Sequence, residues 1–154
     1  MPKSNIIFPV RGDEILLGFK KRGFGAGKWN GFGGKPHDGE TMMQAAIREL
    51  EEESRLVALP ENFQQVAYMV FYEVDTLKFE SDVFFLTNWR GQERETDEMR
   101  PQWFGRDVLP YDVMWADDRH WIPLVLAAKR IKGIVHFKPG MQEVDDFTWQ
   151  ETAF

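Results

Sequence analysis

The sequence predicts an α+β fold built on a mixed, largely antiparallel β-sheet. β-rich runs outnumber helical segments, and the two kinds do not alternate regularly along the chain. Three pairs of these runs are joined by short turns, as antiparallel hairpins are. A length of 154 residues suits one hydrophobic core, so we expect a single domain over residues 1–154.

Runs rich in β-branched and aromatic residues mark the expected strands. These strands are residues 6–10, 14–19, 66–74, 79–89, 103–104, 133–137 and 144–152. Turn residues separate the paired runs at 11–13, 75–78 and 139–140, and residues 20–27 form a loop with three basic residues and three glycines. Apolar periodicity predicts helices at 42–54 and 118–131, and Pro123 lies near the start of the second helix.

Composition excludes several classes of protein. Lys and Arg total 19 against 25 Asp and Glu, and the net charge of -6 argues against a protein that grips a nucleic-acid polymer. An anionic small substrate is still compatible, because bound metal ions reverse the charge locally. The absence of cysteine excludes disulfides, zinc–thiolate sites and a cysteine nucleophile. No apolar run is long enough to span a membrane and residues 1–10 do not resemble a signal peptide, so we expect a cytoplasmic protein without a membrane partner.

The first predicted helix carries an acidic patch beside its apolar stripe. The stripe comprises Met43, Ala46, Ile47 and Leu50. Glu49, Glu52 and Glu53 crowd the edge of this stripe near the helix C-terminus, where both like-charge repulsion and the helix dipole disfavour them. A hard divalent cation would explain the arrangement, because Mg²⁺ prefers carboxylate oxygens. The alternative interpretation is a solvated acidic face.

Glycines precede this helix and strengthen the metal interpretation. Gly31, Gly33 and Gly34 permit close backbone approach or dihedral angles closed to other residues, and Glu40 and Thr41 supply acceptors for the first helical turn. The glycine run alone is weak evidence, since it lacks a Walker lysine and a dinucleotide fingerprint. Together, glycines and acidic helix predict backbone and carboxylates converging on a metal–phosphate site.

Residues 34–56 resemble the Nudix box, Gly-x5-Glu-x7-Arg-Glu-U-x-Glu-Glu-x-Gly-U, in which U is aliphatic. The matching positions are Gly34, Glu40, Arg48, Glu49, Leu50, Glu52, Glu53 and Leu56. The one departure is Arg55 in place of the last glycine, which usually adopts a left-handed conformation at the helix exit. An arginine there costs about 1 kcal/mol, which its favourable charge near a helix C-terminus partly offsets.

The Nudix resemblance implies an α/β/α sandwich that uses Mg²⁺ or Mn²⁺ to hydrolyse nucleoside diphosphates linked to another moiety. It implies that Glu49 and Glu53 are metal ligands and that Glu52 is a further ligand or the general base. Arg48 would orient a helix glutamate by ion pairing, and the Gly33 carbonyl would complete the metal shell.

Three further segments, 23–35, 97–101 and 114–118, resemble the oxidised purine nucleoside triphosphatases within that family. This resemblance implies a monomer that cleaves a triphosphate such as 8-oxo-dGTP or 2-hydroxy-dATP to the monophosphate and pyrophosphate, sanitising the nucleotide pool. Glu98 would be an additional metal ligand or base. In the implied base pocket, Asn30 would hydrogen-bond the purine, Trp115 would stack on it, and Asp117 and Asp118 would contact the base edge. Lys20 and Phe24 would line the mouth of the pocket, and Phe71 would lie on its floor. Residues 74–81 do not align cleanly with the subfamily, and Tyr72, Glu73 and Ser81 are unexpected near its pocket.

Several of the pocket residues have a structural alternative. Asn30 is also a turn residue, Trp115 a core residue, and Asp117 and Asp118 a helix N-cap. In the pocket interpretation, two close carboxyls in apolar surroundings can hardly both ionise, so one keeps a proton and donates a hydrogen bond. The basic run at 20–22 either steers phosphates or is simply solvated.

Three alternative functions remain at this stage. The first is another Nudix substrate, such as a dinucleoside polyphosphate or sugar nucleotide, or promiscuous triphosphate hydrolysis. The second is a silent nucleotide-binding or protein-binding domain, against which the three repelling glutamates argue. The third is a single-stranded nucleic-acid binder that uses exposed aromatics, which the net charge opposes.

Overall fold

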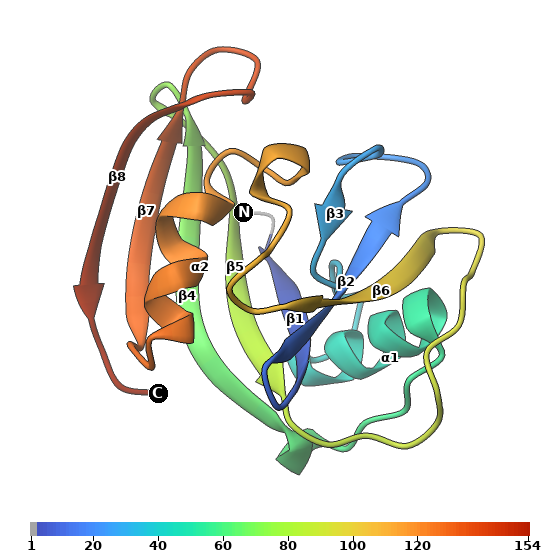
Figure 1. The fold of residues 1–154 in the computed structure, drawn as a ribbon. Coiled ribbons are helices and arrows are strands. Elements are labelled where there is room, and N and C mark those ends of the chain that lie inside the picture. The colour runs from blue at the N-terminus through green and yellow to red at the C-terminus, as the bar shows by residue number, and fades with distance from the viewer. Residues whose placement is uncertain (1–2) are drawn as a thin grey trace.

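The computed structural model describes residues 3–154, in which two helices lie among eight strands (Figure 1). The strands are β1 (Lys3–Arg11), β2 (Glu14–Lys20), β3 (Trp29–Asn30), β4 (Phe63–Glu73), β5 (Thr76–Leu86), β6 (Met99–Gly105), β7 (Ile131–Phe137) and β8 (Val144–Glu151). The helices are α1 (Met42–Ser54) and α2 (Asp118–Leu126), with short 3₁₀ turns at Pro60–Asn62 and Tyr111–Val113. Within residues 3–154, neither helix is long and apolar enough to cross a membrane.

The strands form a mixed sheet of order β3-β2-β1-β5-β4-β7-β8, with β6 paired to β2. Two pairs are parallel, β1 with β5 and β4 with β7, and the other pairs are antiparallel, which confirms the predicted sheet type. β1 and β2 pair only where Val10 meets Ile15 and Arg11 meets Glu14. Beyond this short contact the sheet opens into two parts, with β2, β3 and β6 leaning away from the rest (Figure 1).

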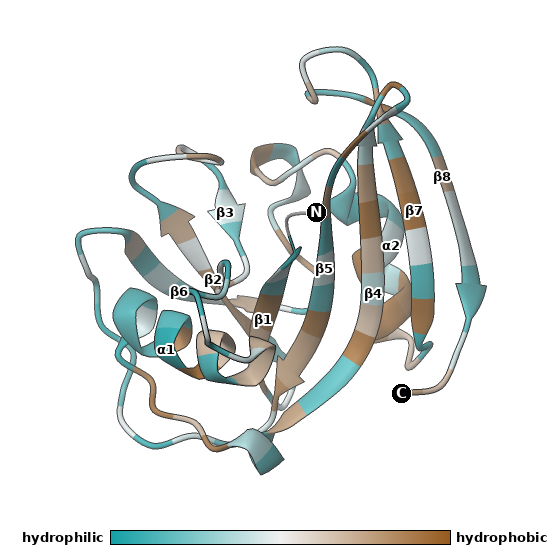
Figure 2. Cartoon of the chain, turned by 180° about the vertical axis from the view of Figure 1, so that it is seen from behind, coloured by the Kyte–Doolittle hydropathy of each residue, from teal (hydrophilic) through white to brown (hydrophobic). Residues whose placement is uncertain are grey.

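Alternating side chains of β1 separate two apolar clusters. Ile7 packs with Ala46 and Leu50 of α1, whereas Phe8 packs with Trp121 of α2. Because successive strand residues point to opposite faces, the two helices cover opposite sides of β1. Figure 2 shows α1 in front of β1 and β6 when the molecule is seen from behind, with α2 on the far side. The expected α+β sandwich is thus observed.

α1 has both of its predicted ends, because local signals define them. Thr41 accepts a hydrogen bond from the Gln44 N–H at 3.1 Å, and the Gln44 side chain accepts from the Thr41 N–H at 2.8 Å, forming a capping box. At the other end Arg55 adopts the left-handed conformation with φ 70°, where the box pattern has glycine.

Other element ends differ from the predictions. α2 ends at Leu126 rather than 131, because Ala128 turns the chain at φ 67° and Ile131 is fully buried as the first residue of β7. β5 ends at Leu86, and Trp89 instead stacks on Trp103 with ring centroids 5.9 Å apart.

Two further strand details also differ. The turn between β4 and β5 is only two residues long, with Val74 at φ 53°. β6 is longer than the expected pair of residues and contains Pro101, which an edge strand tolerates because its N–H is not needed for a second neighbour.

Candidate active site

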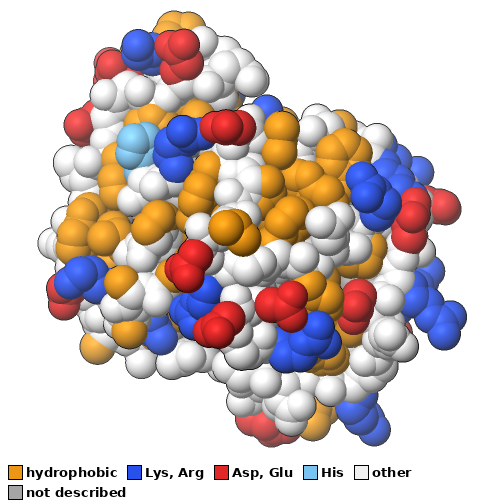
Figure 3. Space-filling view, in the orientation of Figure 1, with side chains coloured by type: hydrophobic (Ala, Val, Ile, Leu, Met, Phe, Trp, Pro, Cys, Tyr) orange, Lys and Arg blue, Asp and Glu red, His pale blue; other side chains and the backbone are white. Residues whose placement is uncertain are grey.

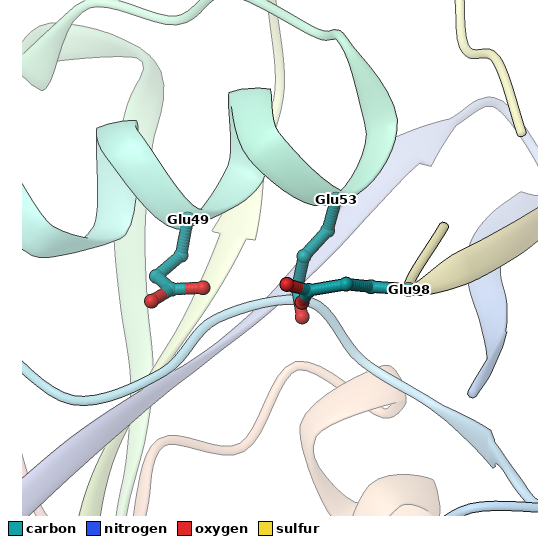
Figure 4. Close-up of side chains that lie close together, drawn as sticks. All are labelled: Glu49, Glu53 and Glu98. Atoms are coloured by element: carbon teal, nitrogen blue, oxygen red, sulfur yellow. The ribbon is translucent and has the colours of Figure 1, made fainter. Parts of the chain in front are cut away.

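Three carboxylates meet at one end of α1. Glu49 and Glu53 lie one helical turn apart, and Glu98 reaches them from the loop before β6; one oxygen of each lies within 4.8 Å of the others. Figure 4 shows Glu49 and Glu53 on the same face of α1, with Glu98 extending towards Glu53. Three of the sequence-predicted metal ligands are therefore brought together from two distant segments.

Burial makes it costly to ionise the carboxyl groups of this cluster. Glu53 is only 3% exposed, and desolvation raises the pKa of its carboxyl to about 8, although the Gly33 N–H donates to its Oε1 at 2.8 Å. Desolvation also raises the pKa of Glu49. Three converging carboxylate oxygen donors of this kind match the preference of Mg²⁺ and Mn²⁺, so the residues fit a hard divalent cation.

Arg48 anchors the outer side of the cluster. Its guanidinium donates to both Glu40 oxygens at 2.8 and 2.9 Å, and it holds the pKa of Glu40 down at about 2. It also donates to Glu49 at 2.9 Å and to Glu52 at 3.2 Å. Glu52 is half exposed and lies beside the three-carboxylate cluster rather than within it. The predicted ion pairing of Arg48 with a helix glutamate is present in the geometry.

The glycine segment passes between β1 and α1 at van der Waals contact. A Cβ on Gly34 would lie 2.7 Å from Cδ of Glu49, and one on Gly33, at φ 130°, would lie 2.2 Å from the Asn5 carbonyl oxygen. Asn5 Nδ2 donates to the Gly34 carbonyl at 3.0 Å and so helps to hold this segment. Nothing local in the sequence marks Asn5 for this role, because it depends on contact between segments 29 residues apart.

A pocket of about 500 Å³ opens next to the cluster, between the two parts of the sheet. Its wall contains all seven residues predicted for substrate binding: Lys20, Phe24, Asn30, Phe71, Trp115, Asp117 and Asp118. Gly33, Gly34 and Lys35 also line it, so the pocket and the carboxylate cluster share one wall. Figure 3 shows hydrophobic side chains gathered across the face on which α2 lies, interspersed with charged groups.

Aromatic rings form two sides of the pocket. Phe24 lies 4.8 Å from Trp115 between ring centroids, and Phe71 lies 4.7 Å from Phe79. Phe24 is 62% exposed whereas Phe71 is buried, so the first is placed at the mouth and the second at the floor. The sequence did not single out Phe79, which closes the aromatic surface because β5 pairs with β4 at Phe71.

The side chains of Asn30 and Trp115 are hydrogen-bonded to each other. The Trp115 Nε1–H donates to Asn30 Oδ1 at 3.0 Å, and Asn30 Nδ2 donates to the Lys28 carbonyl at 2.8 Å. Asn30 therefore braces its turn while it lines the pocket. Trp115 is only partly buried, with Lys28 Nζ 5.6 Å from its ring centroid, so it is not a simple core residue.

The two aspartates are buried at the inner end. Asp117 precedes α2 but makes no side-chain cap; its Oδ2 accepts from Trp121 Nε1 at 2.7 Å, so the N-cap alternative is wrong for this residue. Desolvation raises the pKa of Asp117 to about 6. Desolvation and the charge of Asp117 raise the pKa of Asp118 well above its ordinary value. Burial and the closeness of the second carboxyl thus both disfavour simultaneous ionisation of the pair.

Tyr72, Glu73 and Ser81, which lie around the turn that does not align with the subfamily, are found on two different surfaces. Ser81 lines the pocket. Tyr72 instead stacks on His136 with centroids 4.5 Å apart, and Glu73 accepts from the Gly140 N–H at 2.7 Å, so neither contributes to the pocket wall.

The three basic residues at 20–22 also have different surroundings. Lys20 lines the pocket, whereas Lys21 binds Glu95 and the Thr96 carbonyl, and Arg22 lies 3.6 Å from Glu98. Two of the three bases thus contact the loop that carries Glu98.

Comparison with known proteins gives consistent matches. The family model described as NUDIX domain matches residues 1–125. The "Oxidized purine nucleoside triphosphate hydrolase" of Danio rerio is 46% identical over 134 residues, covering 86% of this chain and 85% of that protein. The protein of the same description from Mus musculus is 39% identical over 150 residues, covering 92% and 95%.

Solved structures show the same fold. The chain superposes on a mutator MutT protein from Bacillus halodurans with a TM-score of 0.80 and 21% identity, covering 97% of this chain and 98% of that one. A MutT NUDIX hydrolase from Burkholderia pseudomallei gives a TM-score of 0.62 and 27% identity, covering 71% and 86%.

Proposed function

Because the chain belongs to the Nudix family, we propose that it hydrolyses oxidised purine nucleoside triphosphates to the monophosphate and pyrophosphate. The observation that carries this proposal is the wall shared by the pocket and the carboxylate cluster, formed by Gly33, Gly34 and Lys35. A purine held in the pocket would direct its phosphates along this wall towards Glu49, Glu53 and Glu98. The biological role would be removal of damaged nucleotides before their incorporation into DNA.

The pocket chemistry suits a modified purine. Trp115 and Phe24 provide aromatic surface for the ring, and Asn30 Oδ1 has a second lone pair beyond the one taken by Trp115. With one proton shared between them, the buried carboxyls of Asp117 and Asp118 would offer one acceptor and one donor. A proton exchanged between these two carboxyls would allow either 8-oxoguanine or 2-hydroxyadenine, whose edges differ in donors and acceptors.

Nudix hydrolases generally use divalent metal ions, and we propose Mg²⁺ or Mn²⁺ here. Glu49, Glu53, Glu98 and the Gly33 carbonyl would hold the ion, and Arg48 would fix the orientation of Glu49. Such an ion supplies neutralisation of phosphate charge and a water of lowered pKa. The proton of the attacking water would pass to Glu52 or Glu98, as the new oxygen–phosphorus bond forms and pyrophosphate leaves.

We also propose that residues 1–154 act as one monomeric, cytoplasmic domain. The core supports the single domain: β7 contributes Val135 and Phe137 to the cluster that contains Phe8 and Trp121, so this strand packs as part of the same unit.

A substrate panel with Mg²⁺ tests the proposal. It comprises 8-oxo-dGTP, 2-hydroxy-dATP, dGTP, dATP, diadenosine tetraphosphate and ADP-ribose, with products separated by ion exchange. We expect preference for an oxidised triphosphate and release of pyrophosphate. Activity on only the last two compounds would reject the base pocket and keep the carboxylate cluster, and no turnover would favour a silent binding domain.

A paired variant tests the pocket separately. Asp117→Ala should abolish discrimination between oxidised and normal bases while Mn²⁺ binding is retained. Asp112→Ala is the control, since this aspartate is 96% exposed. An unchanged ranking of substrates in Asp117→Ala would reject the assigned role of this carboxyl.

A further inference from the structure

Glu98 reaches the carboxylate cluster from a loop, so the geometry of the cluster depends on how that loop is tied to α1. The contact with α1 that lies next to Glu98 is made by the hydroxyl of Thr96. Its Oγ1 donates to the carbonyl oxygen of Glu53 at 3.1 Å and accepts from the N–H groups of Glu98 and Met99 at 3.3 and 3.2 Å. One hydroxyl therefore contacts the backbones of two of the three clustered glutamates.

The contact with α1 meets an ordinary need of helix ends. Glu53 is the second-last residue of α1, and the last carbonyls of a helix lack partners within it. A hydroxyl has one donor and two acceptor lone pairs, and all three are used here. Thr96 is also outside the pocket wall, so nothing in its geometry suggests direct contact with a nucleotide.

A second set of bonds holds the far side of the loop. The Lys21 N–H donates to the Glu98 carbonyl at 2.9 Å, and Lys21 Nζ donates to the Thr96 carbonyl at 2.7 Å. The Thr96 N–H donates to the Met99 carbonyl at 2.9 Å. These bonds do not involve the Thr96 side chain, and the Arg94 N–H also donates to the Ser54 carbonyl of α1 at 2.9 Å. Loss of the hydroxyl would therefore remove the contact next to Glu98 while the rest of the loop stays attached.

We propose that Thr96 is a positioning residue that sets the separation of Glu53 and Glu98 and thereby the affinity of the cluster for a divalent cation. The proposal rests on the metal-dependent function proposed above. It needs no contact between Thr96 and the ion, because groups that orient metal ligands typically change metal affinity 10- to 100-fold when removed.

The test compares Thr96→Val with Thr96→Ser. Valine keeps the shape and removes the hydroxyl, whereas serine keeps the hydroxyl. The readout is Mn²⁺ binding by electron paramagnetic resonance of free Mn²⁺, which requires no substrate. We expect Thr96→Val to bind Mn²⁺ about tenfold more weakly and Thr96→Ser to stay within about twofold of the wild type. At saturating metal the KM for nucleotide should be unchanged.

The control is Thr87→Val, which removes an exposed hydroxyl that bonds the Asn62 carbonyl at 3.3 Å. Thermal unfolding checks that each variant folds, and Thr96→Ala replaces the valine variant if that one does not. Equal Mn²⁺ affinity in Thr96→Val and the wild type overturns the positioning role alone. Equal weakening in the serine and valine variants also overturns it. A wild type that binds no Mn²⁺ overturns the metal site itself and this proposal with it.

Discussion

Replacing Asp117 by asparagine should stabilise the protein in a pH-dependent way. The carboxyl is 3% exposed, and desolvation raises its pKa from 3.8 to about 6. The folded state therefore binds this proton more tightly than the unfolded chain does, so stability falls as pH rises from 3.8 to about 6 and then levels off. The lost stability amounts to about 3 kcal/mol above that range.

Asparagine removes this loss and keeps the local structure. Its Oδ1 can still accept from Trp121 Nε1, which donates to Asp117 at 2.7 Å. The variant should exceed the wild type in free energy of unfolding by about 3 kcal/mol at pH 8 and by roughly half as much at pH 5. Urea unfolding followed by tryptophan fluorescence measures both values.

Asp112→Asn is the matched control, because Asp112 is almost fully exposed and pairs with Arg119. Its effect should stay within about 0.5 kcal/mol at both pH values. A gain for Asp117→Asn that is equal at pH 5 and pH 8, or no gain at pH 8, would show that burial of this carboxyl does not carry the expected cost.

Three other substitutions have defined outcomes. Glu53→Gln should lower turnover at least about 100-fold while raising the melting temperature at pH 8, because it removes a buried carboxyl with a pKa of about 8; unchanged turnover would reject its ligand role. Gly34→Ala should displace Glu49, 2.7 Å from the new Cβ, and raise the Mg²⁺ concentration for half-maximal activity about tenfold; an unshifted activation curve would contradict this. Arg55→Gly should add about 1 kcal/mol and raise the melting temperature by roughly 3 °C in calorimetry, because φ is 70°; a loss of stability would refute the strain argument.

Local signals made part of the fold predictable. The capping box at Thr41 and the apolar stripe of α1 both lie within a few residues, and both ends of that helix were predicted correctly. The end of α2 was wrong because burial of Ile131 in the sheet, which depends on distant strands, overrides helical periodicity. β5 likewise ends before Trp89, which stacks on Trp103 of β6, a contact with a distant segment that β-rich composition does not reveal.

The candidate site divides in the same way. The spacing of Glu49 and Glu53 predicts a shared helix face from the sequence alone, whereas Glu98 and Trp115 came only from resemblance to a family. Phe79 and Thr96 were missed, because a ring on a strand and a hydroxyl in a loop acquire their roles from partners that only the folded chain brings near.

The narrow seam of Gly33, Gly34 and Lys35 bears on how such a molecule can evolve. The carboxylates come from α1 and the loop before β6, whereas the pocket is lined by other strands and loops, and this seam borders both. Substitutions on opposite sides of it that are far apart and share no contact should combine nearly additively. A duplicated gene could therefore acquire a new base preference while it keeps its hydrolytic power. The same independence has a disadvantage. A lineage that loses its pocket contacts would keep hydrolysing undamaged nucleotides. Selection therefore has to act on the pocket and on the carboxylate cluster together.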